Sequence, residues 1–500
     1  MAITDDQAAR TAAPERFDSV SPATGAVVGS FPVDGPEEVA AAVARARPAA
    51  AWWAELGFDG RRKRLLAFKR VLARRCDELC ELVHRENGKP TDDAFIEVLL
   101  ATEHLDWAAR RAERVLRPRR VAPSLLTRNL RAWVEYQPFG VLGVIGPWNY
   151  PVFTPLGSIG YGLAAGNAVV FKPSEHTPAV AAWLRDRFAE VVPEQPVLQV
   201  VTGFGATGEA LCRAGVDKLV FTGSAATGRK VLHACADSLT PVLLELGGKD
   251  AMVVDDDADL DAAAGAAVWG AIANAGQTCI AIERVYAVAP VYDRFVDKVV
   301  ERARDLRSGP GEDADIGPIT MPGQLDVIRR QLDDALARGA RALVGGADSV
   351  HPPFAEPVVL VDVPEDALIM REETFGPVLP IVRVRDAEEA VARANASRYG
   401  LGSAVFGRRR ADALARALRA GMASVNSVQA FAGVPALPFG GVGDSGFGRI
   451  HGDQGLRELS TVKSVVRQRF ALPLEVTSFQ RPARTMPLLG KLVRLRHGRS

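Results

Sequence analysis

The N-terminal part of the chain has apolar residues at helical spacing. From about Pro36 to Leu116 they recur every three or four positions, which predicts helices. One strong breaker, Asn87-Gly88-Lys89-Pro90, interrupts this pattern. Between Pro118 and Pro138 the chain is first basic and irregular. It then alternates apolar and polar positions, which predicts a strand in a ribbon that leaves the main body.

Short apolar runs alternate with helical stretches from Gly140 to Leu246. Helices are expected at Thr177–Val192 and Thr207–Ala214. Short buried strands that alternate with helices predict a parallel sheet with right-handed crossovers. The predicted strands are Val141–Ile145, Ala168–Phe171, Val197–Val201, Lys218–Phe221 and Val242–Leu244.

Four polar segments directly follow strands of this predicted sheet. A sheet of this kind binds ligands in the crevice outside the carboxyl ends of its strands. One crevice can therefore collect all four segments. They are Pro147–Asn149, Lys172–Glu175, Thr222–Gly228 and Glu245–Lys249.

A second α/β region follows. Helices are predicted near Leu260–Asn274, Val291–Leu306 and Asp386–Ala396. The predicted strands are Arg284–Val288, Pro357–Val363, Val378–Val384, Ser403–Phe406 and Ala423–Asn426. Cys279 falls between a helix and a strand, on a loop that we expect to face the first region.

Length and composition predict an ordinary globular protein. A chain of 500 residues exceeds one core, so two or three domains are expected. The net charge of +1 gives no evidence for a nucleic-acid partner. Met1 to Arg10 is poor in apolar residues and is not typical of a secretory signal. The apolar run Ala262–Ala275 is too short to span a bilayer.

The cysteines are odd in number and scattered, which suits a reducing cytoplasm without disulfides. They are Cys76, Cys80, Cys212, Cys235 and Cys279. Cys76, Cys80 and His84 share one face of a predicted helix and could bind a metal, but small apolar packing explains them better. We expect no metal.

Cys279 is the candidate nucleophile. Its flanking Gly276 and Gln277 suit a turn rather than a core strand. A thiolate is the reactive form of cysteine, and a loop near a helix end can lower the thiol pKa. From these residues alone, a structural thiol remains an equal alternative.

Glu245 and Asn149 are candidate partners for a reactive thiol. Glu245 ends an apolar strand, where its pKa should be raised, as a general base requires. A salt bridge to Lys249 or a helix-capping contact is the alternative. Asn149 lies between Pro147 and Pro151, and a rigid amide suits an oxyanion site. A turn Asn that bonds its own backbone is the alternative.

The segment Gly223-Ser224-Ala225-Ala226-Thr227-Gly228 follows a strand and opens a helix. Backbone N–H groups and the helix dipole favour a phosphate there, although neither the dinucleotide fingerprint nor a P-loop is present. Lys172 and Glu175 could hold ribose hydroxyls. A carboxylate at Glu175 would repel a 2′-phosphate, which favours NAD over NADP.

With these residues in place, the chain resembles the NAD(P)-dependent aldehyde dehydrogenase superfamily from about Asp18 to Lys463. Several motifs in the right order carry the resemblance. They are Glu86–Pro90, Pro147–Pro151, Lys172–Glu175, Phe221–Gly228, Glu245–Lys249, Gly276–Cys279, Glu372–Val378 and Pro438–Arg449.

The resemblance implies that Cys279 is the nucleophile and that Glu245 activates the hydrolytic water. Asn149 and the Cys279 backbone N–H would form the oxyanion hole. The implied cofactor-binding residues are Trp148, Lys172, Glu175, Gly223, Ser224, Gly228, Leu246, Glu373 and Phe375. The implied substrate tunnel contains Tyr150, Phe153, Thr154, Ile280, Phe431 and Phe439.

The resemblance also implies an α/β fold with three parts: a Rossmann-type cofactor domain, an α/β catalytic domain and a small β ribbon for oligomerisation. The expected NAD-binding domain is 1–117 with 139–246, and the catalytic domain is 247–462. The ribbon would be 118–138 with 463–472, in a cytoplasmic homodimer or homotetramer.

Substrate choice is only faintly encoded. The predicted tunnel residues, with the loop Val428–Leu437, include no Arg or Lys. A dicarboxylic semialdehyde would need a cation for its far carboxylate. We therefore expect a neutral, apolar aliphatic or aromatic aldehyde, with a semialdehyde as the alternative.

Two other functions are alternatives to aldehyde oxidation that ends with hydrolysis of the thioester by water. In a CoA-acylating enzyme CoA attacks the thioester, but only the hydrolytic route needs a base such as Glu245. A dinucleotide-binding protein without turnover would not need Cys279, Glu245 and Asn149 together.

The tail 473–500 is longer than the family core needs. Leucines and a valine alternate there with Lys491, Arg494 and Arg496. A basic amphipathic helix on an anionic membrane would have this pattern. A solvated or packed tail is the plainer alternative and the one we favour from the sequence.

Overall fold

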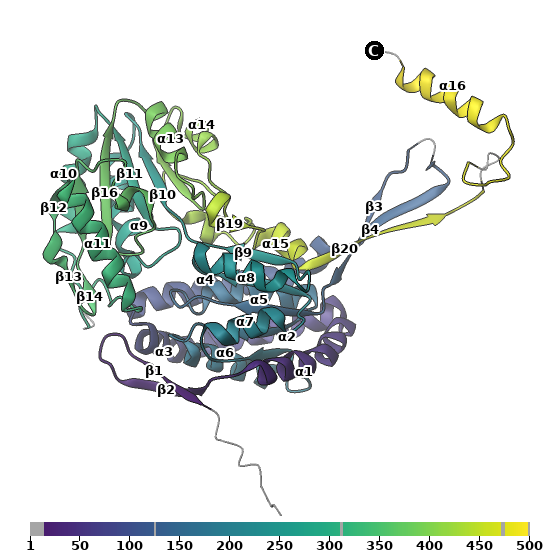
Figure 1. The fold of residues 1–500 in the computed structure, drawn as a ribbon, viewed down its shortest axis with the longest axis horizontal. Helices are drawn as coiled ribbons and strands as arrows, with labels where there is room; N and C mark the ends of the chain where they lie inside the picture. Colours follow the sequence, from purple (N-terminus) through teal and green to yellow (C-terminus); the bar gives the residue numbers. More distant parts are fainter. Residues whose placement is uncertain (1–14, 125–126, 311–313, 472–475, 499–500) are drawn as a thin grey trace, which may run out of the picture. The chain divides into compact units, whose positions relative to one another are not determined.

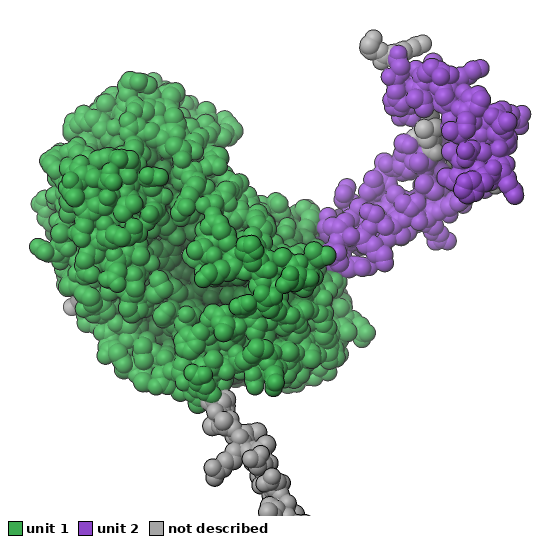
Figure 2. All heavy atoms as spheres, in the orientation of Figure 1, with its two compact units in different colours: residues 1–115, 138–460 green, residues 116–137, 461–500 purple. Residues whose placement is uncertain are grey.

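The computed structural model describes residues 15–124, 127–310, 314–471 and 476–498. It divides into two compact units (Figure 2). The larger unit comprises 1–115 and 138–460, and the smaller comprises 116–137 and 461–500. The Met1–Arg10 segment, interpreted above as no secretory signal, lies outside the described residues, as do the junction residues 472 and 473 between ribbon and tail.

The first sheet of the larger unit has six strands in the order β19-β9-β8-β5-β6-β7. Neighbouring strands run parallel except β19, which is antiparallel to β9. Continuous Val, Leu, Ile and Phe runs form its strands because both faces are buried. The strands are β5 (Val141–Ile145), β6 (Ala168–Lys172), β7 (Leu198–Val200), β8 (Lys218–Thr222), β9 (Val242–Glu245) and β19 (Gly446–Phe447).

Helices lie on both sides of this sheet (Figure 1). They are α1 (Pro36–Glu55), α2 (Gly57–Arg74), α3 (Cys76–Asn87), α4 (Thr91–Leu116), α5 (Phe153–Ala165), α6 (Pro178–Val191), α7 (Gly205–Arg213) and α8 (Ala225–Ala236). The breaker predicted at 87–90 separates α3 from α4. The hairpin of β1 (Arg16–Val20) and β2 (Val27–Pro32) precedes them.

The second sheet has seven strands in the order β12-β15-β16-β11-β10-β17-β18. Its strands are β10 (Asp250–Val254), β11 (Ile282–Val288), β12 (Arg341–Val344), β15 (Val358–Val361), β16 (Val378–Val384), β17 (Ser403–Phe406) and β18 (Ser424–Val425). Helices α9 (Leu260–Ile272), α10 (Tyr292–Ala303), α11 (Gly323–Ala337) and α13 (Ala387–Asn395) pack beside it. Shorter elements complete the unit: β13 (Val350–His351), β14 (Phe354–Ala355), α12 (Leu368–Arg371), α14 (Ala411–Ala417) and α15 (Gly452–Glu458).

Strand β10 is missing from the sequence prediction, which places no strand directly after Glu245–Lys249. The chain leaves the first sheet at Glu245 and enters the second at Asp250. Only the segment Leu246–Lys249 lies between the two sheets. This short connection brings the strand-end residues of the first sheet to the second sheet.

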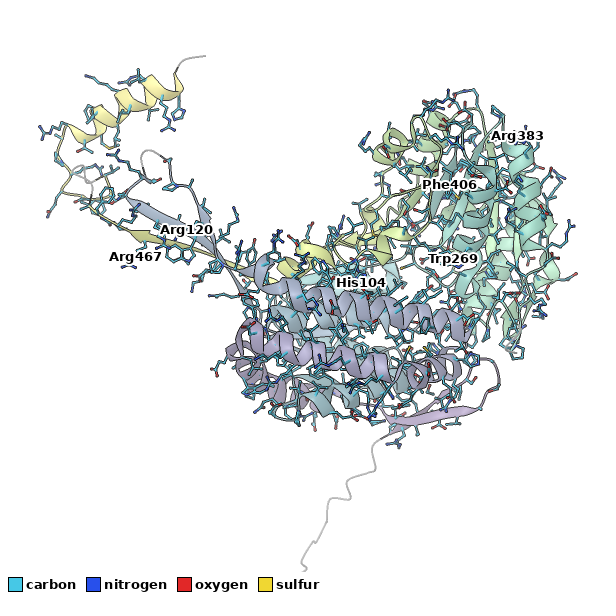
Figure 3. The ribbon with its side chains drawn as sticks, turned by 180° about the vertical axis from the view of Figure 1, so that it is seen from behind. His104, Arg120, Trp269, Arg383, Phe406 and Arg467 are labelled. Atoms are coloured by element: carbon cyan, nitrogen blue, oxygen red, sulfur yellow. The ribbon has the colours of Figure 1, made fainter. Side chains whose placement is uncertain are left out.

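The smaller unit contains a three-stranded sheet in the order β20-β4-β3. The strands are β3 (Arg119–Val121), β4 (Leu130–Pro138) and β20 (Ser460–Gln468). Figure 3 labels Arg120 and Arg467 on this ribbon. Helix α16 (Thr485–His497) follows in the same unit. None of the described helices is both long and apolar enough to cross a membrane.

Candidate active site

The loop that carries Cys279 has an unusual backbone. Asn274 and Ala275 have φ values of 54° and 56°, and Gly276 has a φ of 72°. A side chain at Gly276 would collide with the Gly376 carbonyl. Left-handed conformations at non-glycine residues are costly, and they persist where surrounding contacts hold them. The close approach to Gly376 therefore requires glycine in this loop.

Asn149 is bonded directly to the Cys279 loop. Its side-chain Nδ2 donates to the Gln277 carbonyl at 2.9 Å, and Asn274 Nδ2 donates to the Asn149 carbonyl at 3.2 Å. Asn149 thus bonds another loop and not only its own backbone. One of its two amide hydrogens is used by Gln277, which leaves the second for a developing oxyanion.

Lys89 and Glu97 support this arrangement through buried contacts. Their side chains are fully buried and form an ion pair at 2.6 Å. Lys89 Nζ also donates to the Asn149 carbonyl at 2.8 Å. The other Glu97 oxygen accepts from the backbone N–H groups of Val152 and Phe153 at 2.6 and 3.0 Å. The sequence analysis includes Lys89 in the motif Glu86–Pro90 but assigns it no role, and it does not identify Glu97. The only sign of Glu97 in the sequence is a charged residue at helical spacing.

The Cys279 thiol lies in an environment that keeps it protonated. Burial raises its pKa, and the nearby carboxyl groups of Glu373, Asp250 and Glu245 raise it further. The expected lowering by a helix end is therefore wrong for this state of the protein. Desolvation and acidic neighbours outweigh the loop position.

Glu245 ends β9 and is 3% exposed. Neither carboxylate oxygen has a hydrogen-bond partner among the described residues. Burial raises its pKa well above the usual value, as expected from its strand-end position, and Arg449 opposes this only in part. A side chain at Gly440 would collide with the Glu245 carboxylate.

The alternative of a Glu245–Lys249 salt bridge is wrong. Lys249 Nζ donates instead to Glu283 at 2.6 Å and to Thr374 at 2.9 Å. A side chain at Gly248 would collide with the Cys279 carbonyl. The glycines after Glu245 thus allow the connection between the sheets to pass close to the Cys279 loop.

The segment around Glu373 lies against the same connection. The Glu373 carboxylate accepts from the Gly248 N–H at 2.9 Å and occupies the space that a side chain at Gly247 would need. Burial and then the Glu283 carboxylate raise the pKa of Glu373. Phe375 meets Trp148 edge to face, with ring centroids 5.6 Å apart.

The other predicted cofactor residues lie at strand ends of the first sheet. Lys172 Nζ lies 3.5 Å from the Glu175 carboxylate. Burial raises the pKa of Glu175, but Lys172 and further contacts reverse this, so it is lowered overall. Ser224 caps α8, accepting from the Thr227 N–H at 3.2 Å. Leu246 packs against Gly228, and the Gly223 N–H donates to the Glu245 carbonyl at 3.0 Å.

Four of the six predicted tunnel residues are aromatic. Tyr150 Oη lies 3.0 Å from Thr278 Oγ1, and the Phe431 and Phe439 rings lie 6.4 Å apart. The Ile280 carbonyl accepts from Gln429 Nε2 at 3.1 Å, and the Thr154 N–H donates to the Tyr150 carbonyl at 3.2 Å.

Two buried histidines pack against these aromatic rings and are absent from the sequence prediction. The His104 and His451 rings are 4.1 Å apart, and both contact Phe153 (Figure 3 labels His104). Burial lowers the pKa of His104 to about 4 and that of His451 well below its usual value. Neither ring nitrogen of His451 has a hydrogen-bond partner among the described residues. Both imidazoles are therefore neutral.

The candidate metal face on α3 has a simpler explanation. His84 Nδ1 lies 2.8 Å from the Lys89 carbonyl. Cys76 Sγ and Cys80 Sγ lie 3.7 Å apart. His84 is thus engaged with the breaker segment.

In chemical terms, the site combines a thiol, an amide donor and a buried carboxyl group that accepts no hydrogen bond from any residue the structure describes. Such a set can form, stabilise and hydrolyse a thioester.

Comparisons with known proteins agree on one family. The model described as "Aldehyde dehydrogenase family" matches residues 9–465. The chain is 38% identical to a 4,4'-diapolycopene aldehyde oxidase of Methylomonas sp., over 92% of this chain and 87% of that protein. It is 36% identical to a provisionally named succinate-semialdehyde dehydrogenase [NADP(+)] of Mycolicibacterium smegmatis, over 89% of this chain and 87% of that protein.

A solved structure is also similar across nearly the whole chain. An NAD-dependent aldehyde dehydrogenase from Sinorhizobium meliloti superimposes with a TM-score of 0.88 at 32% identity, covering 93% of each chain.

Proposed function

Because the chain belongs to the aldehyde dehydrogenase family, we propose that it oxidises a neutral, apolar aldehyde to the carboxylic acid with NAD, and that water releases the product. The observation that carries this proposal is Glu245. Its buried carboxyl group has no hydrogen-bond partner within the described part of the chain, lies beside the Cys279 loop and has a raised pKa. A group of this kind suits a general base for thioester hydrolysis.

In this proposal Cys279 attacks the aldehyde carbon and forms a thiohemiacetal. Because its pKa is raised, the thiol must give up its proton during the attack, and solvent water accepts that proton while the aldehyde oxygen becomes the oxyanion. The second amide hydrogen of Asn149 and the Cys279 backbone N–H donate to the oxyanion. Glu245 later accepts a proton from the water that attacks the thioester. A CoA-acylating enzyme would have no use for this base.

The residues at the strand ends fit a dinucleotide. Lys172 and Glu175 supply the charged groups that bind ribose hydroxyls, and the amino end of α8 at Ser224 suits a pyrophosphate. Glu373 would bind the second ribose, with Trp148 and Phe375 beside it. NAD, when bound, supplies the hydride acceptor that turns the thiohemiacetal at Cys279 into a thioester.

The charge of Glu175 supports NAD over NADP. Its lowered pKa keeps the carboxylate ionised, and a 2′-phosphate on the same ribose would be repelled. One relative is named for NADP and one solved structure for NAD, so the relatives allow either cofactor.

The tunnel residues support an apolar substrate. The Lys89 ammonium lies over the Tyr150 ring at 4.0 Å and is neutralised by Glu97. The neutral His104 and His451 add no charge. The diapolycopene aldehyde oxidase is named for a polyene aldehyde, which fits this chemistry. The relative named for succinate semialdehyde keeps a semialdehyde as the second candidate.

An assay of reduced cofactor with an aldehyde panel tests these points. We expect a higher kcat/KM for hexanal or benzaldehyde than for succinate semialdehyde, a preference for NAD, and no need for CoA. The reverse substrate order would exclude the apolar preference, and strict dependence on CoA would exclude hydrolysis. Cys279→Ala should abolish activity, whereas Cys76→Ala, at a thiol of similar exposure, should retain it.

Domain organisation and assembly are proposals as well. We assign NAD binding to 1–117 with 139–246 and catalysis to 247–462, with the ribbon 118–138 and 463–472 pairing with a second copy. Strand β20 is an edge strand of the ribbon sheet, and its Val462 and Val466 are each more than half exposed. An edge strand suits addition of a partner strand. We propose a cytoplasmic homodimer or homotetramer.

A further inference from the structure

Helix α16 exposes more apolar surface than a solvated helix normally does. Leu488, Leu492, Val493 and Leu495 are 44%, 42%, 53% and 64% exposed, and Met486 is 52% exposed. The preceding segment adds Phe479, which is fully exposed. Apolar side chains gathered at this density mark an interaction surface.

These side chains share one side of the helix. Leu488, Leu492 and Leu495 follow the spacing of four and then three residues that places them in a row. At 100° per residue, Leu489, Val493 and Met486 extend this row to one side, so the apolar residues together cover about half of the helix circumference. Arg494 lies opposite the middle of this apolar half, and Lys491 lies on the remaining half next to Leu495. Arg496 lies within the apolar half, between Leu492 and Leu489, where a long side chain can extend its charge towards the polar boundary.

The same segment is strongly basic. From Val476 to Gly498 the sequence carries no Asp or Glu, although the whole chain has a net charge of only +1. The cations of this segment are Arg481, Arg484, Lys491, Arg494 and Arg496. An occupant of this surface must therefore be apolar and anionic at once.

We propose that residues 476–498 bind the surface of an anionic lipid bilayer, with α16 lying in the plane of the membrane. An interfacial helix has a basic polar face and an apolar face that enters the headgroup boundary. A helix of 13 residues is about 20 Å long, too short to span the roughly 30 Å hydrocarbon core. This inference stands independently of the proposed activity.

The other possible occupants fit less well. A second copy of α16 would cover the leucines but would bring two sets of cations together without any acid between them. A nucleic acid would neutralise the cations but would leave the leucines in water. The sequence alone favours a solvated or packed tail, and the exposed apolar side chains of α16 change this interpretation.

The experiment uses the full-length protein and sedimented vesicles of phosphatidylcholine, with or without 30% phosphatidylglycerol. We expect binding to the anionic vesicles only, and weaker binding as salt is raised. Leu488→Glu with Leu492→Glu should abolish binding. Lys491→Glu with Arg494→Glu should reduce it by at least about tenfold.

Matched controls test whether the loss of vesicle binding requires changes on α16 in particular. Leu239→Glu alters an exposed leucine elsewhere, and Arg111→Glu with Arg114→Glu reverses two exposed charges on α4 at the same spacing. Both should bind anionic vesicles as the parent does.

Several results would overturn the proposal. The parent could fail to bind anionic vesicles, or the α16 variants could bind them equally well. If the parent did not bind vesicles and the leucine variants had a lower oligomeric mass than the parent in light scattering, a second copy would be the occupant. If the parent did not bind vesicles but bound a homopolymeric RNA through Lys491 and Arg494, nucleic acid would be the occupant.

Discussion

Glu245 and Glu97 are two buried glutamates that lie near the same site. Glu97 is fully satisfied by Lys89 and by two backbone N–H groups. Glu245 has no partner among the described residues. A buried polar group without a partner destabilises a fold, so it persists where function requires it. The contrast separates the acid that holds the backbone in place from the acid that is free to react.

The largest expected effect is on turnover. Glu245→Gln should lower kcat by about 10²–10⁴-fold, because it removes the proposed general base. A burst of one reduced cofactor per active site should remain, since thioester formation precedes the base step. Stopped-flow absorbance separates the two phases. Equal steady-state rates in parent and variant would show that Glu245 is no base.

The same variant has a pH signature. A carboxyl pKa raised in the folded state contributes stability at low pH that is lost as pH rises through the folded pKa. Glu245→Gln should therefore be more stable than the parent at pH 9 and similar to it at pH 4. Calorimetry at the two pH values measures this, with Glu373→Gln as a second buried acid for comparison.

Glu97→Gln should change stability most. It leaves the Lys89 ammonium buried without a counter-charge, which costs about 3–5 kcal/mol of unfolding free energy. Urea unfolding measures this loss. The pair Lys89→Met with Glu97→Leu removes both charges and should recover part of it, while activity stays low because Asn149 loses its support. A loss below about 1 kcal/mol for Glu97→Gln would contradict the supporting role.

Glu175 is intermediate between Glu97 and Glu245, because it is paired with Lys172 but is partly exposed. Glu175→Ala should raise the ratio of kcat/KM for NADP to that for NAD by roughly three- to tenfold, because one repulsive charge is removed. Asp326→Ala, at an exposed acid on α11, is the control. An unchanged ratio would mean that Glu175 does not determine cofactor choice.

The smallest effect concerns the buried histidines. A histidine pKa lowered in the folded state contributes stability above about 6.5 that is lost as pH falls towards about 4. For each such histidine, the free energy of unfolding falls by about 1 kcal/mol per pH unit as the pH is lowered through this window. His104→Phe should flatten the parent's loss of stability between pH 6.5 and 4, whereas His233→Phe, at an exposed position, should not.

Much of the fold follows from the apolar pattern. Val141–Ile145, Val378–Val384 and Ser403–Phe406 have the predicted bounds, because a fully buried strand must be a short, continuous apolar run. Strand β10 escapes prediction because its run directly follows the polar segment Glu245–Lys249. A single sequence gives no sign that the chain changes sheets there.

The site is predictable only in part, for related reasons. The positions of Cys279, Glu245 and Asn149 at strand ends and in a loop can be read from local patterns. The Lys89–Glu97 pair and the His104–His451 pair depend on contacts between elements far apart in the sequence. The raised pKa of Cys279 likewise depends on carboxyl groups that only the fold brings near.

The connection Leu246–Lys249 also has an evolutionary consequence. The codons for this connection lie between an upstream part of the gene that encodes Glu245 and a downstream part that encodes Cys279. Recombination between two relatives at this junction would join a base from one parent to a nucleophile from the other. Such a hybrid would need glycine at positions 247 and 248, where the connection passes Glu373 and the Cys279 carbonyl.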